Sequence, residues 1–331
     1  MSMPLDRRQM LAGTALAAGL AGTGAFASQS TQTGPDLSGK SILITGTSSG
    51  FGRLGAEHYA RLGAKVFATM RNIPRPEAEE LRQLASDEGY DLHVIEIDVT
   101  DDAQVDAGVK KALGMNEGRL DVLVNNAGIS NAGAIEMQDM EQTTLLFDTN
   151  VYGPHRMARA VLPAMRAQGS GQIFQVSSQL GRVIAPAYGQ YSPTKFALEA
   201  MSEQMAYELV PHGIEVTIIE PGGYPTKIWE NASRQTERLL ARTPEELQAP
   251  YADLLTVVQA SGARERPTDP MDVPRAIAEI IAMPAGERPL RRPVHPAFIP
   301  QEAINKVSAE TQVRFLGDSP LGPLVRAVHN V

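Results

Sequence analysis

Short apolar runs alternate with longer amphipathic stretches along most of this 331-residue chain, beginning near Lys40. The short runs are apolar throughout instead of at every second residue, as strands are when helices cover both faces of their sheet. Strand–helix units repeated in this way form a parallel sheet with right-handed crossovers. The sequence therefore predicts an α/β fold: a single doubly wound parallel sheet with helices on both faces.

The individual elements follow from the same pattern. The predicted strands are Ser41–Thr45, Lys65–Met70, Leu92–Ile97, Leu120–Val124, Gln172–Ser177 and Ile214–Ile219. The predicted helices are Gly52–Leu62, Pro76–Glu88, Asp102–Asn116, one or two within Met140–Gln168, Ser192–Val210, Asp272–Met283 and a C-terminal helix near Ala303–Phe315, the last preceded by proline-rich loops. Residues 222–268 interrupt the alternation after the last strand, where α/β folds bind ligands, and we expect a substrate lid there.

The N-terminus has the pattern of an export signal. Arg7 and Arg8 precede an apolar stretch rich in Ala and Gly, and a small-residue cleavage site follows at Ala25-Phe26-Ala27. The arginine pair resembles a twin-arginine signal, and the stretch is too short and too weakly apolar to favour a permanent membrane span. We expect residues 1–27 to be a signal peptide read by the twin-arginine export machinery, 28–37 a linker and 38–331 the folded domain. That predicts a periplasmic or exported protein; the alternative is an N-terminal extension on a cytoplasmic one.

Composition excludes several classes of function. The formal net charge of −8 argues against a nucleic-acid or anionic-membrane partner. The chain has no cysteine, so disulfides, thiolate zinc sites and a cysteine nucleophile are excluded. Its six histidines are scattered without metal-ligand spacing, so we expect no metal.

A glycine-rich turn, Thr45-Gly-Thr-Ser-Ser-Gly-Phe-Gly52, follows the first predicted strand and opens the first helix. Glycine permits a tight turn and lets backbone N–H groups approach a pyrophosphate at the helix N-terminus. The spacing of Gly46, Gly50 and Gly52 differs from the widespread G-x-G-x-x-G dinucleotide fingerprint. Its position between strand and helix nevertheless predicts a dinucleotide cradle, which would also include Ser48, Ser49 and Phe51.

The end of the second strand indicates which dinucleotide is preferred. NAD-selective sites usually carry an acidic residue there for the ribose 2′-OH, but this strand ends in Thr69-Met70-Arg71-Asn72. Because Arg71 can pair with a 2′-phosphate, we expect NADP(H) in preference to NAD(H). Asp98, at the end of the third strand, could accept a hydrogen bond from the adenine amino group. Asn125-Asn126-Ala127-Gly128 ends the fourth strand as a turn that would stitch neighbouring strands.

Tyr191 and Lys195 are four residues apart and so share one helix face. A free tyrosine has a pKa near 10, and an ammonium group within about 4–6 Å stabilises the phenolate and lowers that value. Tyr191 could then give a proton to a carbonyl oxygen or take one from an alcohol. Ser178, after the fifth strand, could hydrogen-bond the same oxygen. Tyr188 has no lysine four residues further on, so we expect it in the pocket wall.

These motifs together resemble those of the short-chain dehydrogenase/reductase superfamily, in particular its hydroxysteroid- and retinol-dehydrogenase-like members, from about Leu37 to Thr226. The resemblance implies a Rossmann-type fold. It further implies that Asn150 holds a water linking Lys195 to solvent and that Lys195 binds the nicotinamide ribose. The same resemblance implies cofactor contacts by a wider set of residues: Val99, Asn125, Ala127, Gly128, Tyr191, Pro221, Gly222 and Thr226. It also implies a homodimer or homotetramer paired through helices near Val151–Ala167 and Ser192–Val210.

The function expected from this reading is NADP(H)-dependent hydride transfer to or from a secondary alcohol, ketone or aldehyde, with Tyr191 as general acid/base. We expect a fairly apolar small substrate in a pocket that includes Ser178, Leu180, Val183, Tyr188, Tyr224 and Trp229. Two alternatives remain open: an exported isomerase or dehydratase that keeps its nucleotide bound, and a non-catalytic NADP(H)-binding sensor.

Overall fold

The folded domain begins slightly earlier than the sequence predicts. A computed structural model describes residues 34–262 and 267–331, so the predicted signal peptide lies outside the described residues. Leu37, within the predicted linker, is 1% exposed, and its N–H donates to the Leu62 carbonyl at 2.8 Å. The described end of the linker therefore already belongs to the domain.

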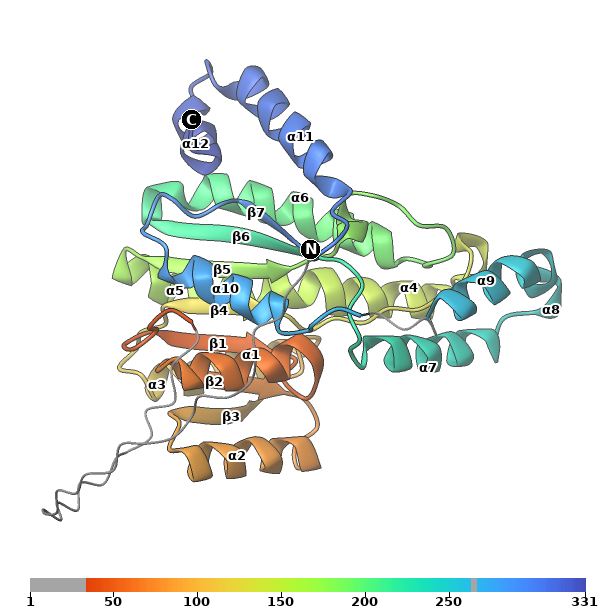
Figure 1. Cartoon of the computed structure of the whole chain (residues 1–331), viewed down its shortest axis with the longest axis horizontal. Coiled ribbons are helices and arrows are strands. Elements are labelled where there is room, and N and C mark those ends of the chain that lie inside the picture. The colour runs from red at the N-terminus through yellow and green to blue at the C-terminus, as the bar shows by residue number, and fades with distance from the viewer. Residues whose placement is uncertain (1–33, 263–266) are drawn as a thin grey trace, which may run out of the picture. The chain divides into compact units, whose positions relative to one another are not determined.

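A seven-stranded parallel sheet forms the centre of the domain (Figure 1), with strand order β3-β2-β1-β4-β5-β6-β7. The strands are β1 Ser41–Thr45, β2 Lys65–Met70, β3 Leu92–Glu96, β4 Val122–Asn125, β5 Gly171–Val176, β6 Ile214–Pro221 and β7 Arg291–Val294. All neighbouring strands pair in parallel. This topology confirms the predicted doubly wound α/β fold.

Helices bury both faces of this sheet. One face is covered by α1 Gly50–Arg61, α2 Pro76–Glu88 and α10 Asp272–Ala282, whose apolar residues share a core with alternate residues of the strands. The other face is covered by α3 Asp102–Gly114, α5 Gly153–Gln168 and α6 Tyr191–Leu209. Burial on both faces is why the strand sequences are continuously apolar.

Some elements differ from the prediction. α1 begins at Gly50 because Ser49, with extended backbone, is its N-cap. The predicted Met140–Gln168 stretch contains α4 Met140–Phe147, a π-helical turn Asp148–Tyr152, and α5. β7 and α12 Gly322–His329 are absent from the prediction. The short Arg-Arg-Pro-Val run of β7 gives no strand signal, and its proline is tolerated because β7 pairs only with β6.

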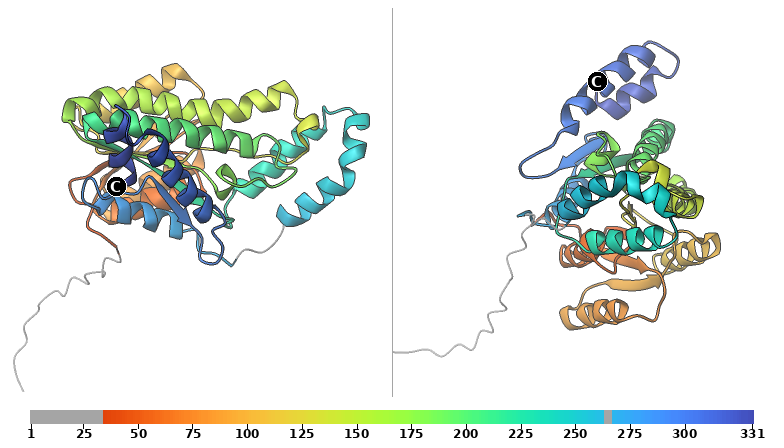
Figure 2. Two further views of the ribbon diagram at one scale, coloured as in Figure 1. Left: turned by 90° about the horizontal axis from the view of Figure 1, so that it is seen from above. Right: turned by 90° about the vertical axis from the view of Figure 1, so that its right-hand side faces the viewer.

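The predicted lid region is largely helical. It contains α7 Ile228–Leu240, α8 Glu245–Gln248 and α9 Ala252–Gly262. In Figures 1 and 2 these helices extend together beyond one end of the strands. Leu240 and Tyr251 pack against a small cluster formed by Ala134, Met137 and Leu255, so this arm has its own apolar anchor beside the main sheet.

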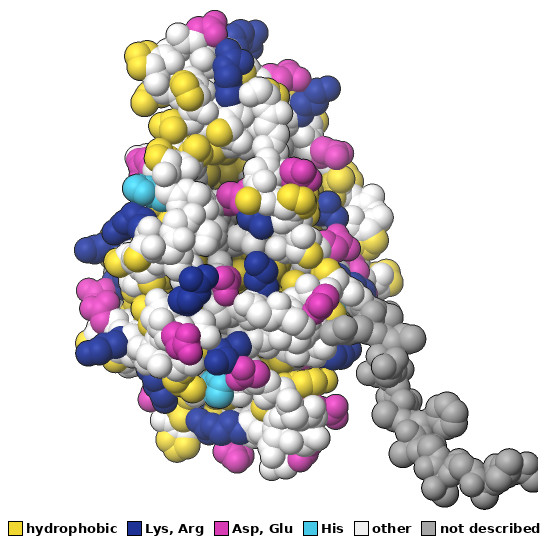
Figure 3. All heavy atoms as spheres, turned by 90° about the vertical axis from the view of Figure 1, so that its left-hand side faces the viewer, with side chains coloured by type: hydrophobic (Ala, Val, Ile, Leu, Met, Phe, Trp, Pro, Cys, Tyr) yellow, Lys and Arg dark blue, Asp and Glu magenta, His cyan; other side chains and the backbone are white. Residues whose placement is uncertain are grey.

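The C-terminal hairpin carries exposed apolar side chains. α11 Gln301–Leu316 and α12 pack against each other, and Figure 3 shows hydrophobic side chains at its surface. Phe315 is 76% exposed and Leu321 is 54% exposed. Within residues 34–262 and 267–331, no helix has both the length and the apolar character required to cross a bilayer.

A buried ionic cluster joins β7 to the rest of the domain. The Arg291 guanidinium lies 2.7 Å from Glu203, 3.2 Å from Glu199 and 3.4 Å from Glu220. Asn305 of α11 donates to the Glu220 carboxylate at 2.6 Å. The cluster thus connects α6, β6, β7 and α11. Arg291 contacts all three carboxylates, and Arg182 adds a second cation 3.8 Å from Glu199.

Replacing Arg291 by methionine should lower the free energy of unfolding by about 3–5 kcal/mol, because it leaves buried carboxylates uncompensated. Arg292→Met is the matched control. Arg292 pairs with Glu279 at the surface, where an ion pair contributes about 0–1 kcal/mol. Urea unfolding of both variants measures the difference. Equal losses would contradict a structural role for the cluster.

Candidate active site

A cavity of about 520 Å³ lies at the carboxyl ends of the strands. Its wall comes from the segments after β1 to β6, from the start of α6 and from α7. Most of the predicted site residues line it: Gly46, Ser48, Ser49, Gly50, Phe51, Arg71, Asp98, Val99, Ala127, Gly128, Ser178, Leu180, Tyr188, Tyr191, Lys195, Pro221, Gly222, Tyr224, Thr226 and Trp229. Four predicted residues, Gly52, Asn125, Asn150 and Val183, do not line it.

The glycine turn requires glycine for steric reasons. Gly46 has φ +72°, and a Cβ there would lie 2.9 Å from the Ala127 Cα. A Cβ on Gly52 would clash with the Gly46 carbonyl oxygen, so Gly52 acts by allowing the helix to approach the turn. Within the described chain, Ser49 makes no side-chain cap hydrogen bond and the first turn of α1 has no acidic residue. This helix N-terminus fits an anionic pyrophosphate.

The Thr45 hydroxyl holds the turn after β4 against the end of β1. Its oxygen accepts hydrogen bonds from the backbone N–H groups of Asn126 and Ala127, both at 3.0 Å. The Asn126 amide donates to the Thr45 carbonyl at 2.9 Å. Asn125, in contrast, is buried and donates to the Pro154 carbonyl. The predicted cofactor contact of Asn125 is corrected: it points to α5, and Asn126 lines the cavity.

Two arginines lie at the end of the cavity nearest β2. The Arg71 guanidinium is 3.5 Å from the Asp98 carboxylate and remains half exposed. Burial acts to raise the pKa of Asp98, but hydrogen bonds from Thr100 and the charge of Arg71 together lower it. Arg75, which the sequence analysis did not identify, also lines the cavity, and it pairs with Glu77 at 2.9 Å. This end therefore has cationic groups suited to a phosphate.

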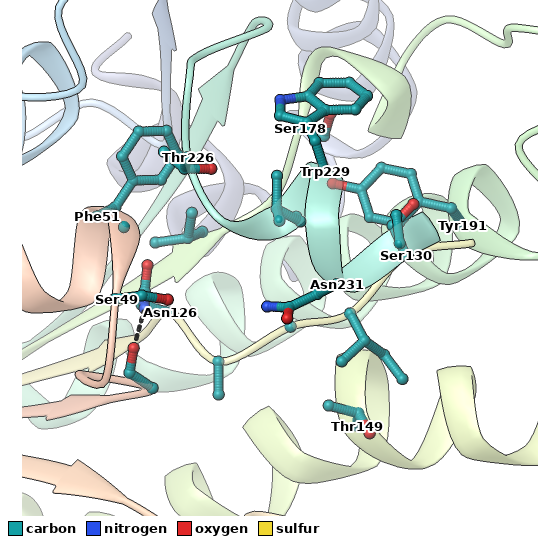
Figure 4. A pocket seen from close by; sticks show the side chains of 18 of the residues that line it. Ser49, Phe51, Asn126, Ser130, Thr149, Ser178, Tyr191, Thr226, Trp229 and Asn231 are labelled. Atoms are coloured by element: carbon teal, nitrogen blue, oxygen red, sulfur yellow. Dashed lines mark hydrogen bonds between the residues drawn. The ribbon is translucent and has the colours of Figure 1, made fainter. Parts of the chain in front are cut away.

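Tyr191, Ser178 and Trp229 come together at the opposite end (Figure 4). Tyr191 is the first residue of α6, and Ser178 follows β5. The Lys195 ammonium donates to the Val176 carbonyl at 2.9 Å and lies 5.6 Å from the centre of the Tyr191 ring. The predicted phenol, cation and hydroxyl are thus neighbours in the same wall.

The pKa values in this wall differ from the expectation. Burial raises the pKa of Tyr191 to about 12, against the opposing effect of its hydrogen bond with Ser178. Burial also lowers the pKa of Lys195 to about 8, although the charge of Glu199 opposes this. The expected lowering of the Tyr191 pKa is therefore absent in the protein alone, because desolvation of the phenolate outweighs the hydrogen bond with Ser178.

Asn150 lies behind the cavity wall in the π-helical turn. Its side-chain oxygen accepts from the Ile129 N–H, and its amide donates to the Ile129 carbonyl and the Thr194 hydroxyl, at 2.9–3.0 Å. These bonds tie the loop after β4 to α6 one residue before Lys195. Its predicted part in a water relay stays a prediction.

The apolar side of the cavity is formed by Leu180, Tyr188 and Trp229. Trp229 is held by its indole N–H, which donates to the Tyr224 carbonyl at 2.8 Å. Tyr224 itself lines the cavity but is mainly a packing residue, and its predicted substrate contact stays a prediction. Its ring is 2% exposed and packs edge-on against Phe51 at 5.4 Å, and its hydroxyl donates to Asp272. Val183 does not line the cavity.

Sequence reasoning missed a polar group of cavity residues on α7. Asn231, Arg234, Gln235 and Arg238 all line the cavity. Their helical spacing of three and four residues places them on one face, and this periodicity could have been read from the sequence. Residues 222–268 were instead predicted to form a single lid, because the order of residues in this segment contains no recognisable motif.

The chain belongs to the short chain dehydrogenase family, which it matches over residues 40–237. It is 38% identical over 244 residues to an uncharacterized oxidoreductase, YusZ, of Bacillus subtilis, covering 73% of this chain and 84% of that protein. It is 35% identical over 209 residues to human 17-beta-hydroxysteroid dehydrogenase type 1, covering 61% and 62% respectively. The protein is therefore an oxidoreductase of the short-chain dehydrogenase/reductase class.

Solved structures of this class support nucleotide binding without deciding between cofactors. A short-chain dehydrogenase/reductase from Burkholderia phymatum in complex with NAD has a TM-score of 0.66 and 26% identity, covering 86% of this chain and 97% of that one. A gluconate 5-dehydrogenase from Burkholderia cenocepacia in complex with NADP and tartrate has a TM-score of 0.55 and 30% identity, covering 58% and 74%. The resemblance to hydroxysteroid-dehydrogenase-like proteins has support; the NADP(H) preference stays a prediction.

Thr45→Val should both destabilise the protein and weaken dinucleotide binding. Valine has a similar shape but leaves the part-buried N–H groups of Asn126 and Ala127 without this acceptor, at up to about 1–3 kcal/mol for each such group. Thr45→Ser keeps the hydroxyl and is the matched control. Urea unfolding and calorimetric titration with the dinucleotide measure both effects. If the valine variant has the same stability and the same affinity for the dinucleotide as the serine variant, this role of Thr45 is contradicted.

Proposed function

We propose that this protein is an NADP(H)-dependent oxidoreductase that transfers hydride between nicotinamide and a secondary alcohol, ketone or aldehyde. The observation that carries the proposal is the convergence of Tyr191, Ser178 and Lys195 in the cavity that also holds the glycine turn. Beside a bound dinucleotide, such a set of hydroxyl groups and an amine can orient a C–O group and transfer a proton to or from its oxygen.

The chain's own residues supply the proton and the orientation. When bound, the nicotinamide supplies or accepts the hydride. In reduction, the Tyr191 hydroxyl gives its proton to the substrate oxygen, and in oxidation the Tyr191 phenolate takes that proton back. The Ser178 hydroxyl donates a hydrogen bond to the same oxygen and fixes its position. Lys195 is held by the Val176 carbonyl, so its amine stays beside the Tyr191 ring and carries a positive charge there below its pKa of about 8.

The cations beside β2 support NADP(H) as the preferred cofactor. Arg71 and Arg75 both line the cavity there. Arg71 keeps about half of its side chain exposed despite its contact with Asp98, so a 2′-phosphate can approach it. A charge-assisted pair of this kind is stronger than a neutral hydrogen bond.

Two aspects of the biological setting are part of the proposal. The twin-arginine pattern at Arg7 and Arg8 supports export to the periplasm, which immunoblotting of periplasmic and cytoplasmic fractions would test. Tyr152, in the π-helical turn just before α5, and Phe196, in α6, are exposed apolar side chains, and they support pairing of subunits through these helices. A monomer by analytical ultracentrifugation would contradict that pairing.

Tyr191→Phe should lower the rate at which a panel of carbonyl compounds is reduced with NADPH by about 10²-fold or more. The variant should still bind the dinucleotide in a thermal-shift assay. In the unaltered protein, the oxidation rate should rise with pH between about pH 6 and pH 10, because the fraction of ionised phenol increases below its pKa. The reduction rate should not rise over this range, since it requires the neutral phenol.

Tyr188→Phe is the matched control for this experiment, because Tyr188 lines the same cavity without a lysine partner. It should keep the rising pH profile for oxidation. A Tyr191→Phe variant with unchanged turnover would contradict the proposed acid/base role. Tightly bound nucleotide with no net oxidation or reduction of any substrate would favour an isomerase or dehydratase instead.

Arg71→Ala should reduce the ratio of kcat/KM for NADPH to that for NADH by about 10–100-fold, the equivalent of one charge-assisted hydrogen bond. Losing the contact between Arg71 and Asp98 affects the reaction with both cofactors. The ratio of the two kcat/KM values therefore isolates the contact with the 2′-phosphate. Arg82→Ala, a surface change on α2, controls for net charge. If Arg71→Ala leaves the ratio unchanged, Arg71 does not select the cofactor.

A further inference from the structure

The substrate end of the cavity carries positive charge that the cofactor does not account for. Among the described cavity-lining residues, Asp98 is the one carboxylate, and it lies at the nucleotide end against Arg71. Arg234 and Arg238 line the cavity from α7. Their wall therefore has two cations and no acidic side chain, in a chain whose formal net charge is −8.

Helix α7 places these arginines on the side of the reacting centre. It follows Thr226, which lies against Gly50 of the cradle, and it begins with Ile228 and Trp229 in the cavity wall. Its second half is anchored on the loop after β4, where the Ala132 N–H donates to the Thr236 hydroxyl at 2.8 Å. That loop pairs with Tyr188, close in sequence to Tyr191, through the Gly133–Tyr188 bridge.

The cavity-facing polar groups on α7 form one continuous strip. Asn231, Arg234, Gln235 and Arg238 are spaced three and four residues apart, so their side chains lie over one another. The Cβ atoms of Arg234 and Arg238, one turn apart, are about 5–6 Å from each other by helix geometry. Two guanidinium groups at this spacing can approach a single carboxylate or phosphoryl group.

The partners of these arginines differ from those of the next arginine along the chain. Arg242 pairs with Asp139, and Glu141 lies 3.6 Å from it. Arg234 contacts the Asn231 side chain, a neutral group that also lines the cavity. Over residues 34–262 and 267–331, neither Arg234 nor Arg238 has a carboxylate partner within salt-bridge distance. An acidic ligand would supply that partner.

We propose that Arg234 and Arg238 bind an anionic group of the substrate, so that the substrate is an oxo acid or hydroxy acid in which the acidic group is a carboxylate or a phosphate ester. Leu180 and Trp229 contact the apolar part of this molecule, while Ser178 and Tyr191 hold its reacting oxygen. This inference rests on the proposed oxidoreductase function and refines the expected apolar substrate: apolar next to the reacting carbon and anionic at the other end.

The test compares charged and uncharged forms of the same substrates. A series of oxo-carboxylic acids of increasing chain length is assayed with NADPH beside the corresponding methyl esters and phosphate-bearing ketones. The variant is the double substitution Arg234→Gln/Arg238→Gln. The control is Arg242→Gln, which removes one positive charge from the segment just beyond α7 at a residue that does not line the cavity.

The proposal expects kcat/KM for the acids or the phosphates to fall about 10-fold or more in the double variant, as for a lost hydrogen bond between charged groups. The esters should change by less than about 2-fold, as should all substrates in Arg242→Gln. The KM of the charged substrates should rise with salt, because exposed charges are screened. Whichever charged series responds identifies the acidic group.

A second readout does not depend on turnover. In the presence of NADP⁺, the oxo acids should raise the melting temperature of the unaltered protein more than that of the double variant, and the esters should affect both equally. Acids and esters that behave alike in both assays would overturn the anion site while leaving the oxidoreductase proposal intact. No turnover of any compound, with acid-specific stabilisation that requires the arginines, would instead reject the reaction and keep the anion site.

Discussion

Burial of a parallel sheet on both faces is the constraint from which the rest of this structure follows. Parallel strands need a crossover between each pair, and the crossover helices cover the sheet. All seven strands then end at the same edge. Residues as distant as Gly46, Ser178 and Thr226 reach one cavity because each follows a strand end. The cavity thus depends on the packing of α1 and α10 on one side of the sheet and α5 and α6 on the other.

The same burial sets the electrostatics of the reacting centre. Tyr191 and Lys195 are taken out of water by the helix that brings them together, and desolvation favours the neutral form of each. Behind them, Glu199 accepts a hydrogen bond from Ser177 at 2.9 Å and belongs to the Arg291 cluster. Helix α6 is consequently fixed through charged groups at its back, while Tyr191 and Lys195 line the cavity at its front.

The cavity divides into regions with different chemistry. The nucleotide end combines a helix N-terminus with Arg71, the reacting centre combines hydroxyl groups with a buried ammonium, and the α7 wall adds exposed guanidinium groups. The first two regions come from strand ends of the central sheet and from the first turns of α1 and α6. The third comes from an arm with its own apolar anchor beside the main sheet.

The sequence by itself determined what depends on local order. Apolar runs predicted six of the strands, because strands buried on both faces are continuously apolar, and helical spacing predicted the pairing of Tyr191 with Lys195. Only the tertiary structure decided what depends on neighbours distant in sequence. β7 forms because Arg291 meets carboxylates from α6 and β6, Asn126 takes the place predicted for Asn125 because Asn125 turns towards α5, and Tyr224 joins the core beside Phe51. The tertiary structure also decided the raised pKa of Tyr191, because burial is a property of the packed protein and not of any segment of its chain.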